Sequence, residues 1–278
     1  MPGRTIAVVN HKGGVGKTST SVNLAAAFGR LGLKALLVDL DPQAHATVHV
    51  GIDRATLGKS MYHVLATRTP ISEIFQPGRI PGITVAPSKI DLAVAEVDLH
   101  RIPGRDLVLR EKLAVVRESF DLIVIDCPPS LGVLTWNALA AADEILIPMQ
   151  AEFLALDGVA NLVDVIEMVR GRLNPKLEIG GLVMTMFDPR ARGRMAMHVQ
   201  TEAQARQFFG DKVYKTRVRR SARLTEAPSH GVSIFEHAPA SSGAADYMDL
   251  AKEVIAHDKH AEAGSGSEST GQAVRQSA

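Results

Sequence analysis

The stretch His11-Lys12-Gly13-Gly14-Val15-Gly16-Lys17-Thr18-Ser19 decides the fold of this 278-residue chain. Residues 12–18 follow K-G-G-x-G-K-[ST], the deviant form of the phosphate-binding loop, which carries an extra lysine before the usual one. Glycines at these positions let successive backbone N–H groups turn inward on a triphosphate. In such a loop Lys17 reaches the β and γ oxygens and the Thr18 hydroxyl binds Mg²⁺. The stretch therefore predicts a nucleotide-binding loop.

The residues on either side of this loop supply the structural context that the motif requires. An apolar run, Ile6–Val9, precedes it, and a helical pattern follows it and ends near Gly32, a residue type common at helix C-caps. A strand, a glycine loop and a helix N-terminus together form an anion-binding site. The alternative is an ordinary glycine turn with two solvated lysines, which chance produces rarely in a chain of this length.

Composition limits the classes of protein that the chain can represent. Hydrophobic residues make up 46% and charged residues 22%, which is ordinary for a globular domain. The net charge is +1, so any affinity for nucleic acid has to come from a local patch. The single cysteine, Cys127, excludes an internal disulfide and fits a reducing compartment. We find no export signal, and the most apolar long stretch, Leu131–Met149, contains Asp143 and Glu144, so we expect a cytoplasmic protein without a membrane span.

Short apolar runs alternate with helical patterns along residues 1–258, which we expect to form one domain. The runs are continuously apolar, as in parallel strands that are covered on both faces, and this predicts an α/β fold with a doubly wound, mostly parallel sheet flanked by helices. Predicted strands are Ile6–Val9, Ala35–Leu40, Ile83–Ala86, Leu122–Asp126, Glu144–Pro148 and Ile179–Met186. Predicted helices are Thr20–Leu31, Leu57–Ala66, Lys89–Asp98, Arg105–Ser119, Thr135–Ala142, Ala155–Arg170, Met195–Phe209 and Gly243–Ile255. Residues 259–278 are rich in Ala, Gly, Ser and Glu and are expected to be a disordered tail.

Acidic residues follow two of the predicted strands. Asp39 and Asp41 close the second one, and Asp126 closes the run at 122–126. An aspartate at a strand end beside a phosphate loop is where P-loop enzymes hold Mg²⁺, and Asp126 fits that role. Asp41, which precedes Pro42, is placed on a loop that could orient the attacking water. Taken alone, each aspartate could also be a simple turn-former.

Several motifs in the same order resemble the ParA/Soj-type chromosome- and plasmid-partitioning ATPases. They are K-G-G-V-G-K-T-S at 12–19, V-D-L-D-P-Q at 38–43 and F-D-L-I-V-I-D-C-P-P-S at 120–130, with further similarity at 184–188, 223–231 and 242–244. The resemblance covers about residues 4–257. It implies a P-loop ATPase that requires ATP and Mg²⁺, forms a homodimer on binding ATP, and binds double-stranded DNA without sequence specificity. It also implies slow hydrolysis, stimulation by a ParB-type adaptor protein, and a cytoplasmic, nucleoid-associated location without membrane attachment.

The resemblance assigns roles to residues of the loop. Lys12 falls on the signature lysine, which reaches across the dimer to the partner's phosphates in the manner of an arginine finger, with a point charge in place of a planar fork. Lys17 holds the β and γ phosphates and Thr18 the metal, while Ser19 is in place for the α-phosphate. Gly13, Gly14, Val15 and Gly16 complete the phosphate cradle.

Residues outside the loop receive roles from the same resemblance. Asp41 falls on an aspartate that is required for hydrolysis, and Asp126 on the second strand-end carboxylate near the metal. Asp39 is expected to support the loop and the metal indirectly, by positioning the residues that contact them. The base pocket is assigned to Met186 and Asp188, although Met186 could equally be a strand-end core residue.

Residues 215–223, Lys-Thr-Arg-Val-Arg-Arg-Ser-Ala-Arg, carry five positive charges, and Arg190, Arg192 and Arg194 form a second cluster. Such runs are more often solvated faces than binding sites. By resemblance, however, Arg220, Arg223 and Arg190 fall on DNA-contacting positions, and Arg217 and Arg219 lie in the same patch. Arg219 departs from the family, which commonly has proline there. Few aromatic residues lie nearby, which favours contact with phosphates over base stacking.

Other P-loop proteins share parts of this pattern. A MinD-type membrane-associated ATPase would end in an amphipathic helix, but residues 261–266 have no apolar stripe. A relative of the nitrogenase iron protein would need two cysteines per chain, and a small-molecule kinase or synthetase would need an acceptor pocket, which we cannot identify. A ParA-like ATPase that positions a non-DNA cargo on the nucleoid stays open, because it would share every motif. The sequence does not distinguish chromosome from plasmid, or a dimer on DNA from a filament.

Overall fold

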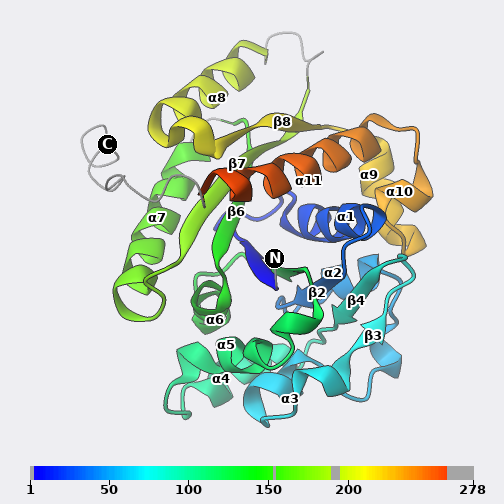
Figure 1. Ribbon diagram of the computed structural model, residues 1–278, viewed down its shortest axis with the longest axis vertical. Helices are drawn as coiled ribbons and strands as arrows, with labels where there is room; N and C mark the ends of the chain where they lie inside the picture. Colours follow the sequence, from blue (N-terminus) through cyan, green and yellow to red (C-terminus); the bar gives the residue numbers. More distant parts are fainter. Residues whose placement is uncertain (1–2, 153–154, 189–194, 262–278) are drawn as a thin grey trace.

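An eight-stranded sheet with helices on both faces forms the body of the molecule, seen in a computed structural model that describes residues 3–152, 155–188 and 195–261 (Figure 1). The strand order is β3-β4-β2-β5-β1-β6-β7-β8. Every neighbouring pair is parallel except β3 and β4, which pair antiparallel. The predicted doubly wound, mostly parallel α/β fold is confirmed.

The boundaries of the elements follow the predicted alternation of strand and helix. The strands are β1 (Arg4–Val8), β2 (Ala35–Asp39), β3 (Gln76–Pro77), β4 (Ile83–Ala86), β5 (Leu122–Asp126), β6 (Glu144–Gln150), β7 (Glu178–Phe187) and β8 (Val213–Arg219). The α-helices are α1 (Lys17–Arg30), α2 (His45–His49), α3 (Met61–Ala66), α4 (Leu92–Leu99), α5 (Val108–Ala114), α6 (Val133–Ala141), α7 (Ala155–Arg172), α8 (Met195–Phe209), α9 (Ala222–Glu226), α10 (Ile234–His237) and α11 (Ser242–Ala261). Short 3₁₀ turns are η1 (Arg54–Thr56), η2 (Ile71–Ile74), η3 (Arg105–Leu107), η4 (Arg117–Ser119), η5 (Gly210–Lys212) and η6 (Ala227–His230).

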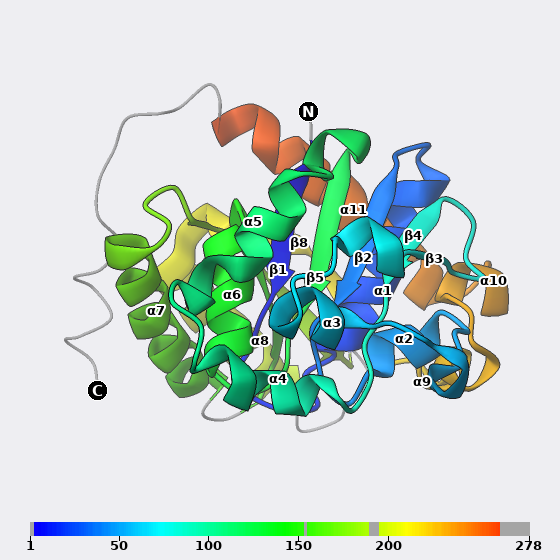
Figure 2. The same ribbon diagram turned by 90° about the horizontal axis from the view of Figure 1, so that it is seen from below.

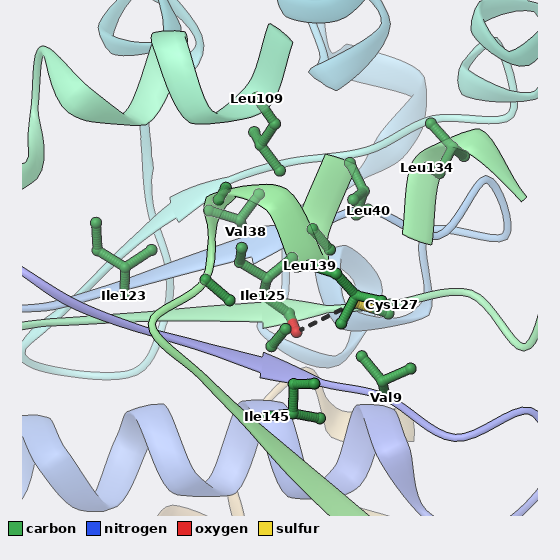
Figure 3. Close-up of a cluster of buried hydrophobic side chains, with 14 of the residues drawn as sticks. Val9, Val38, Leu40, Leu109, Ile123, Ile125, Cys127, Leu134, Leu139 and Ile145 are labelled. Carbon is green, nitrogen blue, oxygen red and sulfur yellow. Dashed lines mark hydrogen bonds between the residues drawn. The ribbon is translucent and has the colours of Figure 1, made fainter. Parts of the chain in front are cut away.

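The central strands are apolar throughout because helices cover both of their faces. All residues of β1, β2 and β5 are buried, and successive side chains point to opposite faces of the sheet. Ile6 and Val8 pack with α1 and α11, whereas Ala7 packs on the face that α3 to α7 cover (Figures 1 and 2). Figure 3 shows this second core, where side chains of α5 and α6 meet those of β2 and β5. Cys127 is buried in it and donates its thiol to Ile125 O at 3.8 Å.

Strand order places a topological switch point at the carboxyl end of β1. The chain leaves β1 for β2 on one side, returns to β5, and crosses to β6 on the other side of β1. Ligands of open α/β sheets bind where the connections diverge in this way. The glycine loop and the aspartates at the ends of β2 and β5 all lie at this edge.

Sequence analysis missed the two-residue strand β3 and the edge strand β8, whose basic stretch was considered only as a solvated face or a DNA-contacting patch. Val213, Tyr214 and Val218 are buried, but the exposed charges between them break the apolar signal of a strand. Charged residues are a common means of protecting a sheet edge, and they hide such strands from pattern reading.

Several predicted helices also differ from the structure: the helix predicted from Leu57 begins at Met61, and α2, α9 and α10 were not predicted. The helix predicted over 105–119 is divided into η3, α5 and η4, because Asn137 of α6 bonds both Arg105 O and the Leu109 N–H and fixes a turn between them. Helix α11 continues to Ala261, and the rest of the predicted tail, residues 262–278, lies outside the described residues.

Candidate nucleotide-binding site

The glycine loop joins β1 to α1 in a conformation that only glycine adopts readily. Gly14 and Gly16 have φ values of 76° and 90°, in the left-handed region. At Gly13, Gly14 and Gly16, a Cβ atom would meet no described heavy atom within 4 Å. The loop thus presents bare backbone to open space at the N-terminus of a 14-residue helix, the arrangement that binds phosphate.

Two buried side chains that sequence analysis missed fix this loop to the sheet. Asn10 donates its Nδ2 to Pro148 O of β6 at 2.8 Å and accepts the Lys12 N–H at its Oδ1 at 2.9 Å. Thr185 of β7 donates its hydroxyl to Val15 O at 2.8 Å. The position of Asn10 just before the motif was a usable signal, whereas nothing in the sequence connects Thr185 to the loop.

Lys17 is buried beneath the loop and points back along it. Its side-chain nitrogen donates to Lys12 O at 3.0 Å, and the residue is 7% exposed. Burial lowers the pKa of Lys17, and the nearby carboxylates of Asp126 and Asp41 oppose that shift. Among the described residues, Lys12 O is the one hydrogen-bond acceptor of the Lys17 ammonium.

Asp126 is linked to the first turn of α1. Its two carboxylate oxygens accept the hydroxyls of Thr18 and Ser21, both at 2.8 Å. The carboxyl is fully buried. Burial is the main cause that raises the pKa of Asp126, and the nearby charge of Asp39 is the second. Asp126 and Thr18, predicted separately from motifs 108 residues apart, are therefore direct partners. Ser21, which also binds Asp126, was missed, although its place one turn after Lys17 puts it on the same helix face.

Asp39 and Asp41 lie on the other side of Asp126 but have different surroundings. Asp39 pairs with Asp126 in the register of β2 and β5, is fully buried, and accepts the N–H and hydroxyl of Thr47 and the N–H of Asp41. Burial raises the pKa of Asp39, and the hydrogen bonds from Thr47 oppose the shift. Asp41 is 8% exposed and accepts only the Gln43 N–H, at 2.8 Å, among its described side-chain bonds. Asp39 is thus committed to supporting α2, whereas Asp41 is available to a ligand.

Lys12 extends from the rim of the loop into solvent. Its Nζ lies 2.7 Å from Glu152 Oε2, just beyond β6, and both side chains are nearly half exposed. Such exposed pairs contribute about 0–1 kcal/mol, so Lys12 can be released from Glu152 at little cost. Sequence analysis did not predict the contact with Glu152.

The end of β7 carries the two residues predicted for the base pocket. Met186 adopts a left-handed conformation with φ of 52°, which is strained for a residue with a side chain. Gln150 of β6 donates to Met186 Sδ at 3.2 Å, and neighbouring Thr185 holds the phosphate loop. Met186 therefore lies close to the loop in a conformation more typical of a functional site than of a plain core position. Asp188 follows it, half-buried.

The residues present fit a magnesium nucleotide better than a metal held by protein alone. Among the described residues, no group of three or more His, Cys, Asp or Glu side chains could hold a metal ion. Mg²⁺ is commonly bound through one or two protein oxygens together with phosphates and water. Thr18 and Asp126 provide that oxygen set beside the open loop.

The basic stretch 215–223 separates into two kinds of arginine. Arg217 makes two bonds to Glu202 of α8, at 2.7 and 3.1 Å, and lies over the Phe187 ring. Arg219 makes a bidentate contact with Asp246 of α11, whose carboxylate also accepts the Arg219 N–H. Both carboxylates are buried, with side chains 5% and 8% exposed. Burial acts to raise the pKa of Glu202, but hydrogen bonds from Arg217 and Arg206 hold it below the usual value.

Arg220 and Arg223 lie just beyond the end of β8 and are exposed, while the side chains of Arg217 and Arg219 are themselves 45% and 43% exposed beside their buried carboxylates. Arg223 pairs with Glu226 at 2.9 Å, with both side chains open to solvent. Arg220 forms no ion pair with any residue in the described part of the chain, and its N–H bonds Phe187 O. The predicted Arg190 cluster, with Arg192 and Arg194, lies outside the described residues. Over the described ranges, we find no helix with the length and apolar character needed to cross a bilayer.

Comparison with known sequences gives one family match over part of the chain and several relatives that match over nearly all of it. A family of AAA domains matches residues 3–179. The sporulation initiation inhibitor protein Soj of Bacillus subtilis is 43% identical over 255 residues, covering 92% of this chain and 99% of that protein. The chromosome-partitioning ATPase Soj of Thermus thermophilus is 47% identical, covering 93% and 98%. The chromosome partitioning protein ParA of Caulobacter vibrioides is 40% identical, covering 94% and 97%.

Solved structures share the fold over nearly the whole chain. A Mycobacterium smegmatis protein described as cobyrinic acid a,c-diamide synthase, with bound ADP and magnesium, superposes with a TM-score of 0.80 at 34% identity, covering 92% of this chain and 95% of that one. The cell division ATPase MinD of Pyrococcus furiosus superposes with a TM-score of 0.74 at 24% identity, covering 91% and 99%. At that lower identity the likeness is one of fold alone.

Proposed function

Since the chain belongs to the ParA/Soj family of chromosome-partitioning ATPases, we propose that it binds ATP with Mg²⁺ in the loop between β1 and α1. The observation that carries the proposal is the direct link from Asp126 to Thr18 beside bare glycine backbone. Lys17 would hold the β and γ phosphates, the backbone of Gly13 to Gly16 would cradle them, and Ser19 would meet the α-phosphate. Magnesium, when bound, neutralises phosphate charge.

Hydrolysis needs a group that orients water near the γ-phosphate. Asp41 is the carboxylate that we propose for this step, because its Oδ1 accepts the Gln43 N–H and its Oδ2 accepts no hydrogen bond from the described residues. Asp126, with Thr18, would meet the metal, and Asp39 would fix their surroundings from its buried position. Met186 and Asp188 are proposed for the base pocket, supported by the strained backbone of Met186 beside the loop.

The position of Lys12 supports the proposal that the chain dimerises on binding ATP. This lysine is on the rim of the loop, while Lys17 already occupies the interior of its own site. A second cation directed outward is suited to a triphosphate bound by another copy of the chain. Two chains that exchange Lys12 in this way would be joined by their ATP molecules.

DNA binding by the dimer is proposed for the surface beyond β8. Affinity for DNA depends on the number of phosphates contacted. In a plot of the logarithm of the binding constant against the logarithm of the salt concentration, each contact contributes a slope of about −0.9. One chain with a few arginines would bind weakly, whereas a dimer doubles the number of contacts on one rigid surface. ATP would thus control DNA binding by assembling the patch, and a ParB-type adaptor would act on the nucleoid-bound, cytoplasmic dimer.

The proposal is tested by measuring mass and DNA binding under the same nucleotide conditions. With a slowly hydrolysed ATP analogue, light scattering should report a mass twice that of the chain, and a random-sequence duplex should be retained. With ADP both should be lost. A single-chain mass under saturating analogue would refute the nucleotide-dependent dimer.

Changing Lys12→Ala separates nucleotide binding from dimerisation. We expect the variant to bind ATP within a few-fold of wild type and to stay a monomer by light scattering, because only the charge directed at the partner is lost. Glu152→Gln is the matched control, since it breaks the same ion pair and keeps Lys12. A Lys12→Ala variant that dimerises normally with ATP would contradict the role of this lysine.

A further inference from the structure

We propose that Arg217 and Arg219 are positioning residues that hold β8 to its flanking helices, so that Arg220 and Arg223 provide the phosphate contacts of this stretch. The inference rests on the DNA binding proposed above and divides that surface into two functions. It is drawn from the partners of each arginine, which counting charges along the sequence does not reveal.

Arg219 is the most constrained of the four arginines. Its guanidinium donates to Asp246 Oδ1 at 2.5 Å through one nitrogen and contacts both carboxylate oxygens at 3.0 Å through another. Its backbone N–H donates to the same carboxylate at 2.9 Å, a bond that proline, the residue expected here from the family, could not make. This chain therefore fastens the end of β8 to α11 with an ion pair.

Helix α11 holds the edge strand at a second point. Glu253, two turns after Asp246, accepts the N–H groups of Lys215 and Thr216 at 2.6 and 2.9 Å. The two acidic residues of one helix thus bond three backbone donors of β8. Figure 1 shows α11 running alongside β8 for much of the strand.

Arg217 connects β8 to a different helix, α8, through Glu202. Glu202, which it contacts through two bonds, also accepts Arg206, and Arg206 in turn donates to Val213 O and Tyr214 O of β8. Arg217 therefore belongs to a network that connects the strand to the helix. Releasing it would disturb contacts made by a nearly buried carboxylate.

The burial of each carboxylate separates the two kinds of arginine. Removing a partner from a buried carboxylate is strongly unfavourable, whereas an exposed pair exchanges readily with other ions. Glu202 and Asp246 are buried, while Glu226, the partner of Arg223, is 45% exposed. A DNA phosphate can compete with Glu226 for Arg223, and Arg220 has no described carboxylate to displace. Arg217 and Arg219 stay with their carboxylates.

The salt dependence of DNA binding tests this division in the full chain with a slowly hydrolysed ATP analogue. Arg220→Gln should flatten the log–log slope by about 1.8 per dimer, two contacts at about 0.9 each. Arg219→Gln combined with Asp246→Asn keeps the net charge and a neutral hydrogen-bonding pair. It should leave the slope unchanged and lower the thermal midpoint by several degrees. Asp246→Asn alone frees the Arg219 charge and should steepen the slope.

Each arm has an outcome that overturns the inference. A slope that flattens in the Arg219 and Asp246 double variant as much as in Arg220→Gln would make Arg219 a phosphate ligand. An unchanged slope in Asp246→Asn would show that Asp246 does not withhold Arg219 from DNA. Should either Asp246 variant fail to fold, Arg217→Gln is measured in its place. In that variant Glu202 still has Arg206 as a partner. A salt slope as flat as that of Arg220→Gln would then overturn the inference. Wild-type protein that retains no DNA with ATP would refute the proposed DNA binding itself.

Discussion

The phosphate loop and the basic stretch at β8 were both recognised as local clusters of functional residues, yet they differ in how the fold uses them. At the loop, residues from two separate motifs converge, and Thr18, Asp126 and Lys17 lie around one open backbone cradle. At β8, two of the four arginines of one continuous stretch are bound to buried carboxylates of α8 and α11. A local charge count therefore does not separate arginines held by buried carboxylates from arginines without such a partner.

The difference has a physical origin. The loop depends on backbone conformation, which glycine spacing encodes directly, so the motif and the geometry coincide. An arginine's role depends on which carboxylate reaches it, and Asp246 and Glu202 are distant from Arg219 and Arg217 in sequence or on another element. Charge patterning without partners cannot separate a binding residue from a structural one.

The largest expected effect is on ATP affinity and comes from a change in the phosphate loop alone. Lys17→Ala should weaken ATP binding by at least about 100-fold, because the triphosphate loses its interior charge-assisted contact. Lys59→Ala, which removes an exposed lysine paired with Glu73, is the control and should bind ATP normally. Titration calorimetry measures both, and near-normal affinity in Lys17→Ala would show that the loop does not act as a phosphate cradle.

A smaller effect tests the proposed role of Asp41 within the loop site. Asp41→Ala should slow ATP hydrolysis at least about tenfold with little change in ATP affinity, since the proposed role is to orient water. Asp53→Ala is a matched control, because Asp53 accepts an N–H two residues on, as Asp41 does. Phosphate release measures turnover, and an undiminished rate would reject the assignment of Asp41.

The smallest effect concerns His49 of α2, a buried histidine outside both regions. His49 bonds the Val232 backbone, its Nε2 has no partner among the described residues, and burial lowers its pKa to about 4. Since the unfolded imidazole takes up a proton near pH 6.5 and the folded one resists until about pH 4, stability should fall on acidification. The expected contribution is about 2 kcal/mol between pH 7 and pH 5.

Urea unfolding at the two pH values tests this in the wild type and in His49→Gln, whose pH dependence should be reduced by that amount. His45→Gln, an exposed histidine on the same helix, should keep the wild-type dependence. Equal dependence in His49→Gln and wild type would place the acid sensitivity elsewhere.

Sequence patterns predicted most of the architecture, and the reason is visible in particular elements. The run at 122–126 was identified as a strand with its exact bounds because both of its faces are buried. The strand at 213–219 was missed because one row of its side chains is charged and engaged by helices far along the chain. Thr185 could not be predicted as an anchor of the phosphate loop, since the contact spans 170 residues.

By itself, then, the sequence determined the nucleotide loop, the three carboxylates at two strand ends and the parallel sheet. Glycine spacing and apolar runs act through local backbone conformation and burial, which are properties of short segments. Tertiary structure alone decided which polar side chains meet: Asp126 with Thr18 and Ser21, Lys12 with Glu152, Arg219 with Asp246. Hydrogen bonds and ion pairs require contact at about 3 Å, and only the packed sheet and helices bring distant residues that close.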